Sequence, residues 1–351
     1  MAEFSPLMLT IARESRGLSQ LALAKASGVS QSALSQIEAG LKPLTADVVS
    51  RVSGPLRYPA SLFGVSLRFQ QLPISFFRKK ARVGVRDVNA IRARVNLYRL
   101  RMEILLRAAD LRDPRVALVN IAKEGLSPEA AAQRLRVYWN VPPGPIKDLT
   151  TLVEDAGIVV LPIDFGNAAV DGLSLYEPND ALPPMIFLRS TLPPDRWRMT
   201  LAHELGHIVL HHHLMIPPDL KDMEDESFAF AQEFLMPTRE VAGHLYSLSM
   251  PRLAQLKLHW RVSMAAIVRR AVSLGRLSDR QARRLWIQLG KHGVNEPVAI
   301  DAEAARNVRK LIEKHLTDLG FTPRELSRAL HQELDEFQSD FGVAVNHLRL
   351  A

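Results

Sequence analysis

The stretch Leu201–His213, LAHELGHIVLHHH, decides what kind of domain surrounds it. It contains the HExxH pattern His203-Glu204-Leu205-Gly206-His207 within a mostly apolar run. This composition predicts a largely buried helix, on which residues four apart share one face about 6 Å apart. His203 and His207 can therefore bind one zinc ion through their ring nitrogens, with Glu204 as a candidate general base. The alternative is a chance match, although chance matches usually fall in polar helices.

A zinc site needs a third protein ligand, and the best candidates lie further along the chain. His211 continues the four-residue spacing but lies about 12 Å along the helix axis from His203, too far for one ion. His213 has the spacing of a metzincin third histidine, but Leu210 stands where that motif needs glycine. Residues 224–237, EDESFAFAQEFLMP, predict a second amphipathic helix with carboxylates at its start. Two histidines on one helix and a glutamate on the next form the gluzincin arrangement.

The same residues carry a family resemblance. HELGHIVLHH, followed by an acidic-x-acidic pattern and FAxxFLMP, resembles the ImmA/IrrE family of zinc metallopeptidases over roughly residues 128–290. The lead-in DRWRMTLA at 195–202 is also similar to that family. Because the family pairs HExxH with a glutamate four residues before an Asn or Asp, the resemblance implies Glu224 as the third ligand. Phe228 replaces that polar residue here, which leaves Glu226 as the runner-up.

A peptidase mechanism follows from this ligand set as a hypothesis. Zinc held by His203, His207 and Glu224 keeps an open fourth position for water and lowers the pKa of that water. Glu204 can then take the proton and later protonate the leaving nitrogen of a cleaved peptide bond.

Two supporting roles are expected but have weaker signals. An oxyanion donor is expected, for which the candidates are Tyr176 and the three histidines 211–213. Carboxylates that orient the zinc-binding histidines are also expected, and the candidates are Asp171 and Asp225.

Composition narrows the class of protein. A chain of 351 residues can hold two or three domains, and 47% apolar residues is ordinary for a globular protein. The absence of cysteine excludes disulfides, thiolate zinc sites and redox switching through the protein's own sulfur. The N-terminus lacks a signal-peptide pattern, and no apolar run approaches about 18 residues, so we expect a cytoplasmic protein with no membrane partner.

Residues 8–53 predict short helices joined by tight turns. Ser19 and Ser30 are predicted helix caps, and Gly28 lies in the turn between the second and third helices. Helix, glycine turn and helix at this size are typical of a helix-turn-helix. The stretch RGLSQLALAKASGVSQSALSQIEAGLKPLTADVV closely resembles the Xre (phage-repressor-like) family.

The Xre resemblance implies contacts with double-stranded DNA. It places Gln31, Ser32 and Ser35 of the recognition helix at base edges in the major groove and Gln20 at a backbone phosphate. Glutamine can make two hydrogen bonds to adenine, whereas Glu38 is expected to have a structural role. Such modules usually bind palindromes as dimers, so a second copy of the chain is a further expected partner. The alternative is a helical protein-interaction module.

The segment Leu67–Arg115 is strongly basic, with thirteen Lys/Arg and four Asp/Glu, whereas the whole chain has a net charge of +8. This charge indicates either contact with phosphate or a solvated helix face. Residues 73–80 predict a strand or an extended segment. From Asp87 onward an apolar stripe with three- and four-residue steps predicts a helix. Its apolar face either forms a dimer interface with a second chain or packs on the protein's own core. The stripe consists of Val88, Ile91, Val95, Tyr98, Met102 and Leu105, and Arg92, Arg94, Arg99 and Arg101 lie off it.

The remaining patterns complete the domain organisation. Helices are predicted at 128–139 and 148–156, strands at 157–163, 170–176 and 184–188, and two helices within 253–271 that split near Val262-Ser263. Residues 300–350 predict amphipathic helices with a packing or interaction role. The predicted domains are a helix-turn-helix at 1–66, a basic helical connector at 67–126, a metallopeptidase domain at 127–290 and a helical tail at 291–351.

The sequence therefore predicts an α+β, mostly helical fold: an all-α helix-turn-helix, a zincin-like (gluzincin) domain with a small sheet and the HExxH helix, and a helical C-terminal extension. The predicted function is a DNA-binding regulator with a zinc-dependent endopeptidase that cleaves a repressor-type protein to derepress stress or mobile-element genes. The alternative is a non-catalytic transcriptional regulator that uses the zinc fold as a sensor or dimerisation platform. A third hypothesis is self-cleavage within 67–115, which would free the DNA-binding head.

Overall fold

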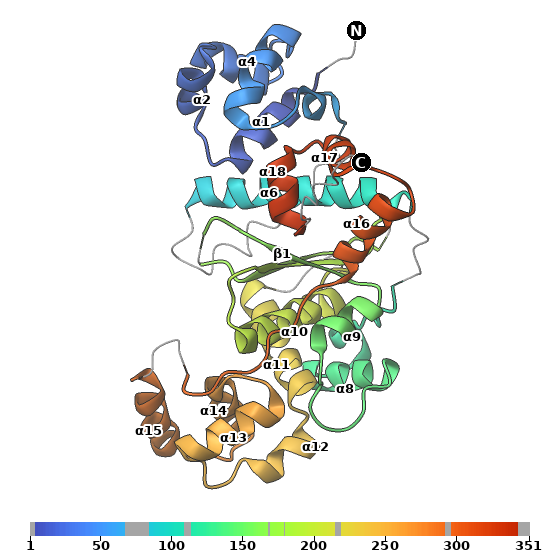
Figure 1. The fold of residues 1–351 in the computed structure, drawn as a ribbon. Coiled ribbons are helices and arrows are strands. Elements are labelled where there is room, and N and C mark those ends of the chain that lie inside the picture. The colour runs from blue at the N-terminus through green and yellow to red at the C-terminus, as the bar shows by residue number, and fades with distance from the viewer. Residues whose placement is uncertain are drawn as a thin grey trace. The chain divides into compact units, whose positions relative to one another are not determined.

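The computed structural model resolves two compact units (Figure 1). It describes residues 4–66, 84–108, 114–167, 169–178, 180–214, 219–291 and 296–342. Unit 1 takes in the described residues of Met1–Leu111, Asp164–Val170 and Val308–Ala351, and unit 2 those of Arg112–Ile163 and Asp171–Asn307. The strand or extended segment predicted at 73–80 lies outside the described residues. Within the described ranges, no helix has both the length and the apolar character to cross a membrane.

The N-terminal helices of unit 1 form where the caps and turns predict them. The Ser19 side chain accepts a hydrogen bond from the Ala22 amide, and Ser30 caps the next helix in the same way. Gly28 takes the left-handed conformation, with φ of +69°, that glycine adopts most readily. The elements are α1 (Pro6–Ser15), α2 (Gln20–Ser27), α3 (Gln31–Glu38), α4 (Ala46–Leu56) and the 3-10 helix η1 (Ala60–Gly64).

The long helix α6 (Val85–Leu106) corrects the interpretation of the basic segment. Apart from the partly exposed Tyr98, its apolar stripe is buried within the folded chain, so packing on the protein's own core is the alternative that the structure supports. Arg99 and Arg101, which were expected on a solvated or phosphate-binding face, are only 4% and 5% exposed. That expectation is wrong for these two arginines, because a buried guanidinium cannot contact a DNA backbone.

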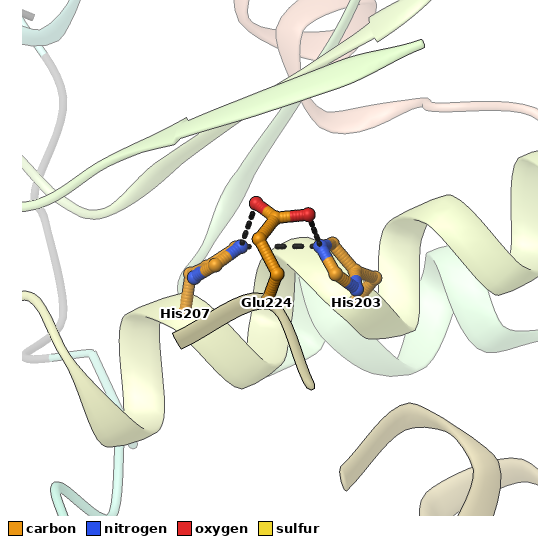
Figure 2. A group of neighbouring side chains, drawn as sticks. All are labelled: His203, His207 and Glu224. Atoms are coloured by element: carbon orange, nitrogen blue, oxygen red, sulfur yellow. Dashed lines mark hydrogen bonds and ion pairs between the residues drawn. The ribbon is translucent and has the colours of Figure 1, made fainter. Parts of the chain in front are cut away.

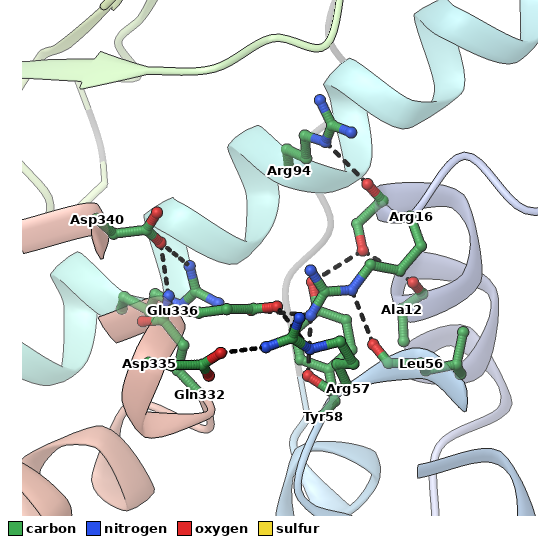
Figure 3. Close-up of polar contacts among 12 residues, drawn as sticks. Ala12, Arg16, Leu56, Arg57, Tyr58, Arg94, Gln332, Asp335, Glu336 and Asp340 are labelled. Carbon is green, nitrogen blue, oxygen red and sulfur yellow. Dashed lines mark hydrogen bonds and ion pairs between the residues drawn. The ribbon is translucent and has the colours of Figure 1, made fainter. Parts of the chain in front are cut away.

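The C-terminal helices of unit 1 lie against its N-terminal ones (Figure 3). Carboxylates of α18 (Leu334–Phe341) pair with arginines of the other helices. Glu336 lies 2.9 Å from Arg16, Asp340 lies 3.5 Å from Arg101, and Asp335 pairs with Arg57. The two preceding helices are α16 (Asn307–Thr317) and α17 (Pro323–Ala329).

Unit 2 contains a three-stranded sheet with the order β1-β3-β2. The strands are β1 (Val159–Ile163), β2 (Gly172–Leu175) and β3 (Met185–Arg189), within two residues of the predicted bounds at either end. β1 runs parallel to β3 with Val160 opposite Ile186, and β2 runs antiparallel to β3 with Leu173 opposite Phe187. β2 therefore lies at one edge of the sheet.

Helices pack against this sheet and complete the unit. The HExxH helix α10 (Pro194–Leu210) contacts β2 and β3, and α11 (Leu220–Leu235) packs along α10 (Figure 1). The remaining elements are α7 (Ile121–Glu124), α8 (Pro128–Tyr138), α9 (Leu149–Asp155), α12 (Thr238–Val241), η2 (Ala242–His244), α13 (Met250–Trp260), α14 (Met264–Ser273) and α15 (Asp279–Gly290). The predicted fold class, α+β and mostly helical, is confirmed. The division into the four predicted domains stays a proposal.

Candidate metal centre and DNA-binding surface

Two neighbouring helices bring His203, His207 and Glu224 together (Figure 2). The Nε2 atoms of the two histidines, one turn apart on α10, lie 3.1 Å from each other. The Glu224 carboxylate, from the first turns of α11, lies 3.5 Å from His207 Nε2 and 3.8 Å from His203 Nε2. The His207 side chain is 1% exposed, whereas those of His203 and Glu224 are 18% and 27% exposed, so the group is accessible from one side.

This donor set fits a zinc ion. Ligands at about 2.0 Å in tetrahedral geometry lie about 3.3 Å from one another, close to the three separations found here. Two imidazole nitrogens and one carboxylate are also the donors of a common catalytic zinc site. The role of these residues as ligands stays a prediction.

A glycine lets the two helices approach closely at this point. A Cβ atom added to Gly206, within the HExxH pattern, would lie 3.2 Å from the Ser227 backbone and from the Phe230 ring. Even a single Cβ atom at this position would require Ser227 or Phe230 to move by a few tenths of an ångström, so glycine suits the close approach of α11 to α10.

Glu204 lies beside the group, on the side of the sheet. It is 6% exposed, and its Oε2 atom accepts a hydrogen bond from Ser174 Oγ of β2 at 2.9 Å. Ser174 Oγ also lies 3.1 Å from Nε2 of His212. β2 comes close to α10 here because Gly172 has no side chain: a Cβ atom would meet Thr200 at 2.6 Å. A strand hydroxyl thus fixes the carboxylate predicted to act as general base.

The outer nitrogen of His207 has partners that the sequence analysis did not assign. His207 Nδ1 lies 3.0 Å from Ser227 Oγ and 3.1 Å from Nδ1 of His211. His211 Nε2 in turn lies 2.8 Å from the Glu226 carboxylate, so the runner-up ligand pairs with a different histidine. His211, one helical turn beyond His207, was the signal that could have revealed this arrangement.

The predicted orienting role of Asp171 is wrong. Its two carboxylate oxygens accept hydrogen bonds from Arg189 at 2.6 Å and from Arg196 at 2.8 Å. Asp225 is exposed on α11, and no contact between its carboxylate and a histidine is found among the described residues, so its orienting role stays a prediction. Arginines compete successfully for Asp171 because a guanidinium makes charge-assisted bonds to a carboxylate.

Two of the three consecutive histidines are held neutral by their surroundings. Burial, followed by the nearby His213, lowers the pKa of His211 to about 4. Burial and the neighbouring His211 lower the pKa of His212 to about 4. Near neutral pH both rings therefore offer one donor and one acceptor nitrogen. The oxyanion-donor roles of Tyr176 and the three histidines stay predictions.

The predicted DNA contacts lie on and beside α3. Gln31 and Ser32 are exposed at the start of this helix, and Ser35 is half-buried one turn later. Gln20 is half-buried: it donates to Glu38 at 2.9 Å and accepts from Gln31 at 3.0 Å. Their roles toward DNA stay predictions.

Glu38 has the structural role expected for it. Its carboxylate accepts two hydrogen bonds from Arg13 of α1, at 2.6 and 2.8 Å, and thereby ties α3 to α1. Burial opposes the charge of Arg13, but its bonds to Glu38 raise the pKa of this guanidinium further.

Two stretches of the chain match known families. Residues 9–63 match the family described as helix-turn-helix. Residues 153–272, which contain the sheet and both site helices, match the M78 peptidase family, described as the IrrE N-terminal-like domain. No curated protein matches the chain.

Proposed function

We propose that this chain is a DNA-binding regulator that also acts as a zinc-dependent endopeptidase. It joins an Xre-type helix-turn-helix DNA-binding domain to an IrrE/ImmA-like domain of the M78 peptidase family. The proposed substrate class is a repressor-type protein, whose cleavage would derepress stress or mobile-element genes. The observation that carries the proposal is the group His203, His207 and Glu224 beside the buried carboxylate of Glu204.

The number of ligands favours catalysis over a structural role. Structural zinc sites are usually closed by four protein ligands, whereas catalytic sites have three and keep one position open. Within the described part of the chain, the group has three members, and two of them are partly exposed. A purely structural zinc site also has no use for Glu204, which burial and Ser174 hold next to the ligands.

The chain's own residues would divide the reaction between them. When bound, zinc supplies Lewis-acid chemistry and lowers the pKa of water at the site. Glu204 would take a proton from that water as the water oxygen bonds to the peptide carbonyl carbon. It would then deliver the proton to the nitrogen that leaves as the C–N bond breaks. Ser174 would hold Glu204 in position, and Ser227 with His211 would fix the ring of His207.

The test compares wild type with Glu204→Gln in cells, with the exposed Asp222→Asn on α11 as matched control. We expect about one zinc per chain in all three proteins, because none of these changes removes a ligand. New protein N-termini, detected by mass spectrometry, should accumulate with wild type and Asp222→Asn but not with Glu204→Gln.

Two outcomes would contradict the peptidase proposal. The same cleavage products in cells with Glu204→Gln would exclude Glu204 as the general base. Unchanged gene regulation by Glu204→Gln, with no new N-termini in any sample, would favour the non-catalytic regulator. Self-cleavage within 67–115 would instead convert the purified wild-type protein into two smaller fragments after zinc is added, which mass spectrometry of the intact protein would detect.

A further inference from the structure

A cavity of about 250 Å³ lies within unit 1, beside the C-terminal end of α1 and the first half of α6. Three arginines line it: Arg16, Arg86 and Arg94. Among the described residues, Asp87 is the one carboxylate in its lining, and that carboxylate already accepts a hydrogen bond from Asn167 at 2.8 Å. The lining thus has three positive charges and one negative charge, and the Glu336 carboxylate, outside the lining, pairs with Arg16 at 2.9 Å.

Hydrogen bonds to backbone carbonyls hold the arginines in fixed positions (Figure 3). Arg16 donates to the carbonyls of Leu56 at 2.7 Å and Arg57 at 2.8 Å and to the Glu336 carboxylate at 2.9 Å, and its guanidinium lies 4.1 Å from the centre of the Tyr58 ring. Arg94 donates to the Ser15 carbonyl at 2.8 Å.

Arg86 and the loop opposite it complete the lining. Arg86 donates to the Gly17 carbonyl at 2.6 Å, and Arg94 also donates to the Asp164 carbonyl at 3.2 Å. Gly166 has no side chain and a φ of +68°, and a Cβ atom there would collide with the Arg94 guanidinium. The loop thus leaves room for Arg94 to point toward the cavity.

Fixed guanidiniums of like charge around one cavity are suited to an anion. Each guanidinium has five N–H donors, more than the carbonyl bonds described above consume, and its planar fork matches the oxygens of a phosphoryl group. Their mutual repulsion, which Glu336 compensates only at Arg16, is relieved further by an anion bound between them. The cavity is smaller than the roughly 300–1,000 Å³ of most ligand pockets, which limits the ligand to a small one.

We propose that this cavity binds a phosphoryl dianion, either inorganic phosphate or the phosphate group of a small monoester, as an effector site on the DNA-binding unit. The site is separate from the His203, His207 and Glu224 group and does not depend on peptidase activity. Ligand contacts with both α1 and α6 would link the helix-turn-helix to the helix that follows it along the chain.

The first experiment is calorimetric titration of the full chain with inorganic phosphate and with glycerol 3-phosphate, in buffers of matched ionic strength. Arg86→Gln removes a guanidinium that is exposed and therefore not needed for the core. The control is Arg107→Gln, directly after the C-terminal end of α6, because the Arg107 side chain is 71% exposed and does not line the cavity. We expect binding by wild type and Arg107→Gln, with about tenfold weaker binding by Arg86→Gln.

The relative affinity of the two probes identifies the source of the phosphoryl group. Tighter binding of glycerol 3-phosphate indicates a monoester ligand, and tighter binding of phosphate indicates the free ion. A phosphate-dependent rise in the thermal unfolding midpoint that Arg86→Gln loses gives a second readout. No binding by wild type at millimolar ligand, or an equal loss in Arg86→Gln and Arg107→Gln, would overturn the proposal. The proposal would also be overturned if Arg86→Gln weakened the binding of duplex DNA but left the binding of both small ligands unchanged.

Discussion

The candidate metal centre and the recognition surface of the helix-turn-helix place their functional side chains in opposite environments. Around the metal centre His207, His211 and Ser227 are all 3% exposed or less, and they bond to one another. On α3, Gln31 and Ser32 are exposed. A metal site needs ligands fixed before the ion arrives, whereas DNA contacts must be free to reach base edges. The cost of changing a side chain should therefore differ between the two regions.

Ion pairs in the two units also differ in how far they are buried. In unit 2, Glu233 and Arg270 form a pair in which both side chains are 3% exposed or less. Burial alone would raise the pKa of Glu233, but hydrogen bonds from Thr238 and Gln133, together with the charge of Arg270, hold that pKa below its usual value. In unit 1, Arg57 and Asp335 form a pair whose side chains are 55% and 68% exposed.

The largest effect is expected for the third ligand. Loss of a residue that only hydrogen-bonds to a zinc ligand can lower zinc affinity by up to roughly 100-fold. Glu224→Gln should lower it further, because it replaces a proposed ligand with a neutral amide, which is a poor zinc donor. Metal analysis after dialysis should give about one zinc per chain for wild type and almost none for this variant. Glu226→Gln, which alters only the partner of His211, should retain zinc. The reverse result would make Glu226 the ligand.

Breaking the buried ion pair should have the next largest effect. Glu233→Ala leaves Arg270 buried without its partner, which we expect to lower the free energy of unfolding by about 3–5 kcal/mol in urea titrations. Because folding lowers the pKa of Glu233, its stabilising contribution is complete above the unfolded-state value of about 4.3 and is lost as the pH falls through the folded-state value. Glu313→Ala, in an exposed pair with Arg309, is the control. Equal losses in both variants would remove the distinction between buried and exposed pairs.

A smaller effect is expected at the recognition surface. Gln31→Ala should weaken binding to the specific DNA site by about 1–3 kcal/mol, the value of one bidentate base contact, without changing the free energy of unfolding. Fluorescence anisotropy with the operator duplex measures the loss, and the exposed Gln288→Ala in unit 2 is the control. An unchanged affinity would show that Gln31 does not face a base.

The smallest effect is expected for the exposed ion pair of the C-terminal helix. Asp335→Asn removes a partner of Arg57 in a place where water screens both charges, so the midpoint of thermal unfolding should not change measurably. Calorimetry of both proteins at low salt, where surface pairs contribute most, is the most sensitive test. A clear fall in the midpoint would show that this ion pair stabilises the contact between α18 and the N-terminal helices.

The local elements could be predicted because their signals are local. Ser19, Gly28 and Ser30 fix helix ends through bonds within a few residues, and strands follow from short β-branched and apolar runs. The four-residue spacing of His203 and His207 places both on one helix face, whatever packs against it. The sequence by itself therefore predicted most of the elements, both family resemblances and the pair His203 and His207, and the resemblance added Glu224 with Glu226 as runner-up.

Only the tertiary structure decided which helix faces which. That Glu224, rather than Glu226, points at the histidines depends on how α11 packs along α10, which Gly206 permits. Arg99 and Arg101 of α6 look like solvated charges in sequence, yet they are buried, and Arg101 lies beside Asp340 from the far end of the chain. Periodicity reports which face of a helix is apolar, but contacts between distant residues depend on packing that no short stretch encodes.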